Sequence, residues 1–158
     1  TFQKERGAPE GSQTFDELIS WTNRPEEGIK YFSGTAAYEK GINISQDRLQ
    51  AGQRVYLDLG EVKHIAEVFV NDQPLGILWK PPYRIDITDA VKPGANTVRV
   101  EVTNVWKNRL IKDAQLPKDK RVAWCFYPFY QNEPDAPLME SGLLGPVKVM
   151  SSRTITLD

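Results

Sequence analysis

Apolar side chains recur at every second position through most of the segment from Arg54 to Thr103. The pattern is clearest in "RVYLDLG", "AEVFVND", "YRIDITD" and "NTVRVEVTN". Because successive side chains of a strand point to opposite faces, this alternation predicts antiparallel strands with one buried face. The residues expected to point inward are Val55, Leu57, Leu59, Ala66, Val68, Val70, Ile85, Ile87, Val98, Val100 and Val102.

Further strands are expected on both sides of this segment. Residues 29–44, "IKYFSGTAAYEKGINI", read as a long strand interrupted at Gly34, and residues 146–158 supply one or two closing strands. The sequences "NDQPLG" and "KPGAN" are turn signals. Seven or eight strands with helix only near the start predict an all-β fold, a β-sandwich in which Leu57, Val68 and Val100 share one interior.

The start of the chain reads differently. Residues 1–13 are polar and without a period, so we expect a flexible tail there and a single domain over 14–158. Thr14 and Glu17 have the spacing of a capping box. Together with the apolar residues that follow, this predicts a short helix over residues 15–20, which "NRPEEG" at 23–28 would end.

Bulk properties exclude several functions. The net charge of −1 favours neither nucleic acid nor an anionic membrane as a partner. No apolar run approaches the roughly 20 residues that span a bilayer, and we see no signal peptide. Cys125 is the only cysteine and His64 the only histidine, so we expect neither a disulfide within the chain nor a cysteine-based zinc site.

Residues 105–146 show no clear alternation and exceed the usual length of a loop. The stretch "NRLIKDAQ" within them predicts a helical turn. A loop of this length is either functional or packed by its own side chains.

Aromatic residues in and near this loop are the candidates for carbohydrate binding, because sugars stack on aromatic faces while polar side chains take their hydroxyls. Three interpretations stay open. We favour internal packing first, with Trp79 over the core edge and Arg109 paired with Asp113. Docking onto another domain comes second and sugar binding third. The candidate binding residues are Trp124, Tyr127, Tyr130, Trp79, Trp106 and Arg109.

Catalysis by this chain alone is not expected. Glycoside hydrolysis usually needs two carboxylates about 5–10 Å apart. Asp86 and Asp89 bracket a turn, where aspartates commonly accept backbone N–H groups, and His64 reads as a solvated or capping residue. No catalytic residue is therefore assigned. The carboxylate pairs considered are Asp58 with Glu61, Asp86 with Asp89, and Glu133 with Asp135.

The stretch "AEVFVNDQPLG … PPYRIDITDAVKPGANTVRVEVTN" resembles the sugar-binding-domain-like jelly roll of family 2 glycoside hydrolases. More specifically, "YFSGTAAY", "LDLGEVKHIAEVFVN", "LGILWKPPYRIDIT", "TNVWKNRLIKDAQLP" and "SGLLGPV" resemble the C-terminal domain of family 106 glycoside hydrolases, the α-L-rhamnosidases. The resemblance runs from Trp21 to about Ile155. Asp72 and Lys112 stand where that pattern has glycine.

The resemblance implies a galactose-binding-like jelly roll that is a fragment of a larger, secreted or periplasmic enzyme. This domain would be a non-catalytic accessory to a hydrolase of rhamnose-containing glycans. Its partners would be the parent's catalytic domain and an oligo- or polysaccharide. No cofactor is expected, although fold analogy allows a structural Ca²⁺. The alternative is a stand-alone carbohydrate-binding module that uses the loop aromatics.

Overall fold

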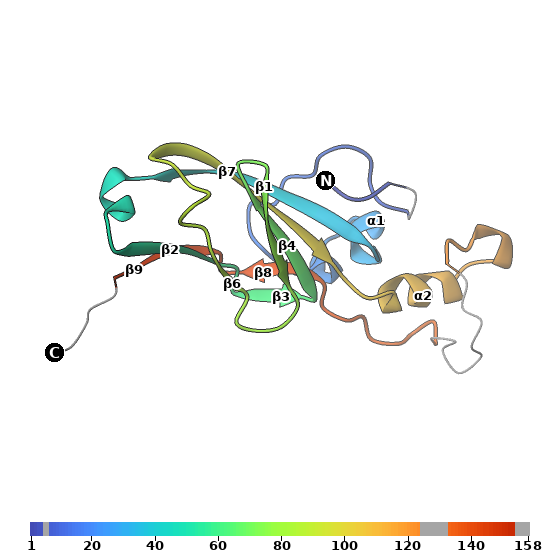
Figure 1. The fold of residues 1–158 in the computed structure, drawn as a ribbon. Coiled ribbons are helices and arrows are strands. Elements are labelled where there is room, and N and C mark those ends of the chain that lie inside the picture. Colours follow the sequence, from blue (N-terminus) through green and yellow to red (C-terminus); the bar gives the residue numbers. More distant parts are fainter. Residues whose placement is uncertain (5–6, 124–132, 154–158) are drawn as a thin grey trace.

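The computed structural model of the protein describes residues 1–4, 7–123 and 133–153. Two short helices and nine strands account for most of the regular structure in these ranges (Figure 1). In chain order the elements are η1 (Trp21–Asn23), α1 (Glu27–Lys30), β1 (Thr35–Ile44), η2 (Gln46–Leu49), β2 (Gln53–Asp58), β3 (Glu61–Lys63), β4 (Ile65–Val70), β5 (Gln73–Leu78), β6 (Arg84–Asp86), β7 (Gly94–Thr103), α2 (Lys107–Ala114), η3 (Lys118–Lys120), β8 (Gly142–Gly145) and β9 (Lys148–Arg153).

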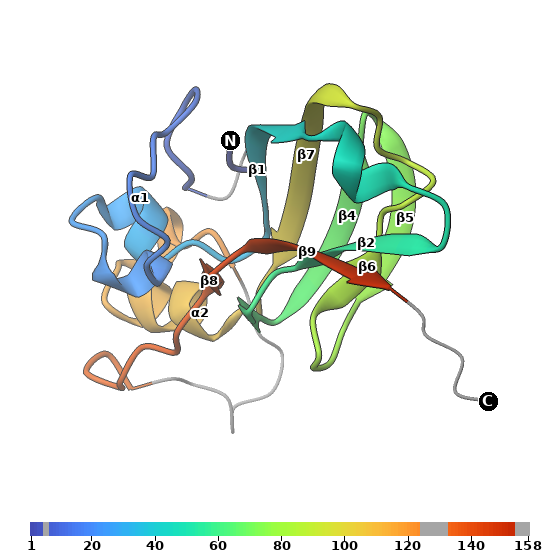
Figure 2. The same cartoon turned by 90° about the vertical axis from the view of Figure 1, so that its left-hand side faces the viewer.

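The strands form two main layers. One sheet has the order β1-β7-β4-β5 and the other β6-β2-β9, while β3 and β8 form a separate pair; every pairing is antiparallel. Figure 2 shows β2 and β9 crossing in front of the four-stranded sheet, with the helices gathered at one end. The architecture confirms the expected β-sandwich.

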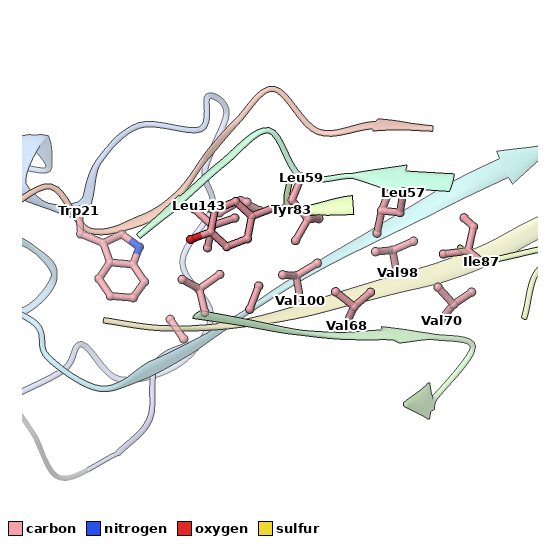
Figure 3. Packing of buried hydrophobic residues seen from close by; sticks show 14 of the residues in the cluster. Trp21, Leu57, Leu59, Val68, Val70, Tyr83, Ile87, Val98, Val100 and Leu143 are labelled. Atoms are coloured by element: carbon pink, nitrogen blue, oxygen red, sulfur yellow. The ribbon is translucent and has the colours of Figure 1, made fainter. Parts of the chain in front are cut away.

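The aliphatic interior lies where the alternation predicts it. Leu57 on β2 faces Val68 on β4 and Val100 on β7 across one interior (Figure 3), and all three are buried. Period-two alternation is enough to identify these core residues, because each strand buries one face only.

A tight turn joins β4 to β5. Its central residues, Asn71 and Asp72, have φ angles of 49° and 64°. Two successive positive φ values are the signature of the hairpin turn whose twist matches its strands, and Asn and Asp tolerate them better than most residues. Aspartate at the position where the resembled pattern has glycine therefore leaves the hairpin intact.

The helix predicted over residues 15–20 is absent: these residues contain only bends and irregular backbone. Instead Ser20 caps η1 by accepting the N–H of Thr22, and α1 lies in the segment that was expected to end a helix. A capping box stabilises a helix by only about 1 kcal/mol. Burial of apolar side chains stabilises the observed conformation by more: Trp21 is fully buried, and the ring centroid of Phe15 lies 5.7 Å from that of Tyr38.

The first residues also differ from the expected flexible tail, because they pair with the edge of β1. Thr1 and Ala37 exchange two backbone hydrogen bonds of 2.8 Å, and the N–H of Gln3 donates to the carbonyl of Thr35 at 2.9 Å. The ring of Phe2 packs edge-on against the buried Trp21 and Phe32. Backbone pairing of residues 1–3 with β1 requires no periodic pattern of side chains, so it could not be predicted from the sequence.

Candidate functional site

Helix α2 opens the long segment that lacks alternation, and it confirms the helical turn predicted there. Its buried residues are mostly polar: Asn108, Arg109 and Asp113 are buried beside Ile111. Lys112, at the expected glycine position, is helical and pairs with Glu27 at 2.8 Å. A helix that buries polar groups lacks an ordinary apolar stripe, so the sequence predicted the helical turn but not which of its side chains are buried.

Arg109 and Asp113 form a buried ion pair across one helical turn. Nε of Arg109 donates to Oδ1 of Asp113 at 3.0 Å, and Nη2 donates to the same oxygen. Both side chains are less than a tenth exposed. This confirms the predicted pairing, and it engages the guanidinium with the helix instead of leaving it open to a sugar hydroxyl.

The carboxylate of Asp113 also holds the chain just before residues 124–132, the segment that contains Trp124, Tyr127 and Tyr130. Asp113 accepts the backbone N–H groups of Val122 at 3.2 Å and Ala123 at 2.7 Å. Residues 124–132 follow directly, and they lie outside the described residues. The candidate roles of Trp124, Tyr127 and Tyr130 therefore stay predictions, as does the environment of Cys125.

Helix α2 also holds the returning chain. The amide of Asn108 donates to the carbonyl of Met139 at 2.7 Å and accepts the N–H of Met139 at 2.8 Å. Nε2 of Gln115 donates to the carbonyl of Pro134 at 2.8 Å. Both sides of residues 124–132 are thus fixed to one helix.

A buried polar network ties this helix to the sandwich. Ser141 Oγ accepts from the side-chain amides of Asn104 and Asn108 at 3.1 Å each, and its backbone N–H donates to Ser20 Oγ at 3.1 Å. Asn104 also donates to the carbonyl of Phe32 at 2.9 Å. Satisfied buried networks of this kind rigidify what they support. We call Asn104, Asn108, Arg109, Asp113 and Ser141 the loop base.

Sequence reasoning found Arg109 and Asp113 but missed the three other members of the loop base. Their bonds join Asn104 and Asn108 to Ser141 across 37 and 33 residues of chain. The one local signal was the placement of two asparagines in "TNVWKN", directly after a buried strand.

The two described tryptophan candidates come from different elements. Trp79 follows β5 and is 67% exposed, with Nζ of Lys80 5.1 Å from its ring centroid. The expectation that Trp79 covers the core edge is therefore wrong, because the inward positions of β5 belong to its neighbours. Trp106 precedes α2 and is 43% exposed. The structure brings Trp106 beside the loop base.

Trp79 belongs to a small apolar surface on the outer face of the four-stranded sheet. Glu67 pairs with Ile77 in the β4–β5 register, and continuing that register places Ile65 opposite Trp79 on the same face. Ile65, Ile77 and Trp79 are all exposed. We call these three residues the outer apolar patch; such patches commonly mark contacts with another protein surface.

Two of the candidate carboxylates, Asp58 and Asp86, have structural partners. Asp58 accepts the N–H of Gly60 and pairs with Arg84, and these bonds hold its pKa below the usual range. Asp86 accepts the N–H of Thr88, as the turn interpretation predicted, and its pKa is also lowered: hydrogen bonds from Thr88 and Arg54 outweigh burial, which would raise it. A general acid needs a raised pKa, which is the opposite shift.

Among the described residues no group of three or more histidine, cysteine, aspartate or glutamate side chains is arranged to hold a metal ion. No helix within the described ranges is both long enough and apolar enough to cross a bilayer.

Residues 22–137 match the family described as "Glycosyl hydrolase 2 galactose-binding domain-like". The chain belongs to this family. The match covers both sheets, apart from the C-terminal strands, together with α2 and most of the long loop.

The chain spans between 13% and 17% of the length of the three similar proteins described next. The chain is 44% identical to a protein from Formosa agariphila named "Putative beta-glucuronidase", over 85% of this chain and 13% of that protein. The structure of a rhamnosidase from Novosphingobium sp. PP1Y superposes with a TM-score of 0.87 and 39% identity, over 96% of this chain and 14% of that one. A β-glucuronidase from Lactobacillus rhamnosus gives a TM-score of 0.53 and 25% identity, over 63% of this chain and 17% of that one.

Proposed function

We propose that the chain is a non-catalytic accessory domain of a glycoside hydrolase acting on rhamnose-containing glycans, and that it braces the catalytic domain. The observation that carries the proposal is the rhamnosidase likeness: 96% of this chain superposes on 14% of that protein. Most of the length of that rhamnosidase therefore lies outside the region that matches this chain.

The chemistry of two candidate carboxylates supports a non-catalytic role. Asp58 and Asp86 both carry lowered pKa values and are held by arginines and backbone N–H groups. A glycosidase acid must instead keep its proton near neutral pH, usually in an apolar pocket. These two aspartates stabilise a turn and a strand pair.

Two surfaces suit a bracing role. The outer apolar patch offers aliphatic and aromatic area on rigid strands, which is the composition typical of interface centres. The loop base is a buried, hydrogen-bonded network in and beside α2, and it holds the described chain on both sides of residues 124–132. A rigid surface loses less entropy on contact with a partner.

The alternative is direct carbohydrate binding through Trp124, Tyr127 and Tyr130, which lie outside the described residues. Aromatic side chains can stack against a sugar ring while polar groups take its hydroxyls. In this case the 158-residue chain would itself bind rhamnose-containing oligosaccharides.

Calorimetric titration of the 158-residue chain with such oligosaccharides, beside an assay on an aryl α-L-rhamnoside, separates these functions. Bracing predicts no heat of binding and no turnover. Binding that is lost in Trp124→Ala and Tyr127→Ala, with folding intact, would establish the alternative. Turnover by the wild-type chain would overturn the non-catalytic assignment.

Bracing is tested in the full-length parent enzyme by replacing Ile77 and Trp79 with serine. Loss of the patch should lower the parent's melting temperature or activity, while the same changes leave the 158-residue chain folded. Met150→Ser is the matched control, because Met150 is an exposed apolar residue on the other sheet. Equal effects of the patch and control changes would argue against the patch.

A further inference from the structure

The outer edge of β1 is paired over its first residues and bare beyond them. The two bonds between Thr1 and Ala37 show that the N–H and carbonyl of Ala37 point to this edge. By strand alternation those of Glu39, Gly41 and Asn43 point the same way. Within the described ranges these three residues have no backbone partner on that side, since β1 otherwise pairs only with β7.

An apolar groove opens beside this bare edge. It has a volume of about 830 Å³, and its lining includes residues of β1 and of β9, the outer strand of the facing sheet. The inner-face residues of both sheets line it, together with part of the N-terminal segment. Those that matter for the argument are Tyr38, Lys40, Ile42, Leu57, Val98 and Val149.

Lys40 has an unusual place in this groove. It pairs with Val98 in the β1–β7 register, so it projects from the face that carries the core, yet it is exposed. No ion pair to Lys40 is found among the described residues. The sandwich is therefore open at this edge, and in the described structure Lys40 projects among mostly apolar inner-face residues.

We propose that an extended segment of the parent enzyme, continuing upstream from Thr1, pairs with this edge as an additional strand and closes the groove. The inference rests on the proposed function only in requiring a longer parent chain. Direction and register follow from the existing pairing. Because Phe2 and Ala36 pair antiparallel, a chain entering Thr1 along this edge runs past Ile44 first and past Tyr38 last.

The register also specifies the chemistry of the added strand. The first, third and fifth residues upstream of Thr1 would oppose Tyr38, Lys40 and Ile42, and residues opposite one another share a face. The first and fifth would fill the apolar groove, as Phe2 does next to them. A carboxylate at the third would pair with Lys40. The partner is thus an alternating strand with apolar residues on its inner face.

Inward-facing charges on edge strands can instead serve to prevent pairing. Amide hydrogen exchange by NMR separates the two roles. The 158-residue chain is compared with a chain extended by the eight residues that precede Thr1 in the parent. A third chain carries an eight-residue Gly/Ser extension, which tests whether any extension suffices.

Pairing predicts that the amides of Glu39, Gly41 and Asn43 exchange about 100-fold more slowly in the native extension than in the other two chains. The amides of Lys40 and Ile42, which face β7, should change little. Equal exchange in all three chains would overturn the proposal. So would slowing of the same size with the Gly/Ser extension.

A matched pair of substitutions at Gly41 tests the hydrogen bonds themselves. A Cβ at this position meets no atom within 4 Å. Gly41→Pro removes the outward N–H and fixes φ at about −65°, which edge strands tolerate, whereas Gly41→Val keeps the N–H. In the natively extended chain, the proline variant should lose the slowed exchange at Glu39 and Asn43, and the valine variant should keep it. Retention in both variants would overturn the proposal.

These readouts do not involve activity or sugar binding. If the strand fails to form, the accessory role stands unaffected. If the 158-residue chain hydrolyses rhamnosides, the accessory role fails while the exchange result still decides the strand.

Discussion

The carboxylate of Asp113 pairs with Arg109 inside α2 and, on its other side, accepts the backbone of the chain that enters the aromatic loop. One buried carboxylate therefore connects α2 to the backbone of Val122 and Ala123. Isolated buried charges are strongly unfavourable, so neither partner of the pair is replaceable alone. Gly7 packs against the guanidinium from the N-terminal segment, where a Cβ would come within 2.9 Å of Nη1.

Asp113→Ala should destabilise the chain by about 3–5 kcal/mol, because it leaves the buried guanidinium of Arg109 without a partner. Urea unfolding at pH 7 measures this loss. The double change Arg109→Met with Asp113→Leu should recover much of the stability, since it removes both charges. It should not restore slow amide exchange at Val122 and Ala123. A single variant as stable as wild type would show that the pair is dispensable.

Gly142→Ala should cost more than the same change at another glycine with positive φ. Gly142 has a φ of 101°, and an added Cβ would lie 2.5 Å from Nε1 of the fully buried Trp21. Gly52 has a φ of 79°, and a Cβ added there would meet no atom within 4 Å, so Gly52→Ala carries only the strain of about 1–2 kcal/mol. Overpacking should add about 1–3 kcal/mol at Gly142. Equal urea midpoints for the two variants would contradict this account.

Tyr38→Phe should destabilise the fold by about 1–3 kcal/mol, because the indole N–H of Trp21 loses its acceptor. That N–H donates to the hydroxyl of Tyr38 at 2.5 Å, and the backbone N–H of Leu143 donates to the same oxygen. Tyr56→Phe is the control, since within the described residues the Tyr56 hydroxyl makes no hydrogen bond. Urea unfolding at pH 7 compares the variants, and equal losses would refute the role of the Tyr38 hydroxyl.

Stability should fall as the pH drops from 7.5 to 5, through His64. Burial, with a smaller contribution from Lys63, lowers the pKa of this imidazole, and its Nδ1 has no hydrogen-bond partner in the described structure. The fold therefore favours the neutral ring. Its contribution is present above the unfolded pKa of about 6.5 and is lost as the pH falls through the folded value.

His64 is the only histidine, so its replacement isolates this effect. His64→Gln cannot titrate, and its urea midpoint should stay nearly constant over the same interval. A wild-type midpoint that does not move between pH 7.5 and 5 would exclude a buried neutral imidazole.

Side-chain alternation was enough to predict β2, β4, β6 and β7 and the shared interior of Leu57, Val68 and Val100. The reason is that a strand's side-chain period is local, and burial of one face repeats at every second residue. The pairing of Arg109 with Asp113 was equally legible, because residues four apart on a helix are neighbours.

In two other places, local sequence patterns predicted the wrong structure or gave no prediction. The capping spacing of Thr14 and Glu17 predicted a helix, yet the packing of Phe15 against Tyr38 holds that segment in another conformation. The sequence around Trp79 did not show whether its ring would be buried against the core or exposed to solvent. That outcome depends on which face of β5 the register assigns to the surface.

The amino-acid sequence alone determined the sandwich, its aliphatic interior and the family, because all three depend on short-range patterns and motifs. Tertiary structure decided the loop base, the outer apolar patch and the bare edge of β1. These arise when residues far apart in the chain, such as Asn104 with Ser141 or Thr1 with Ala37, are brought together, and hydrogen bonds between such distant partners leave no periodic trace in the sequence.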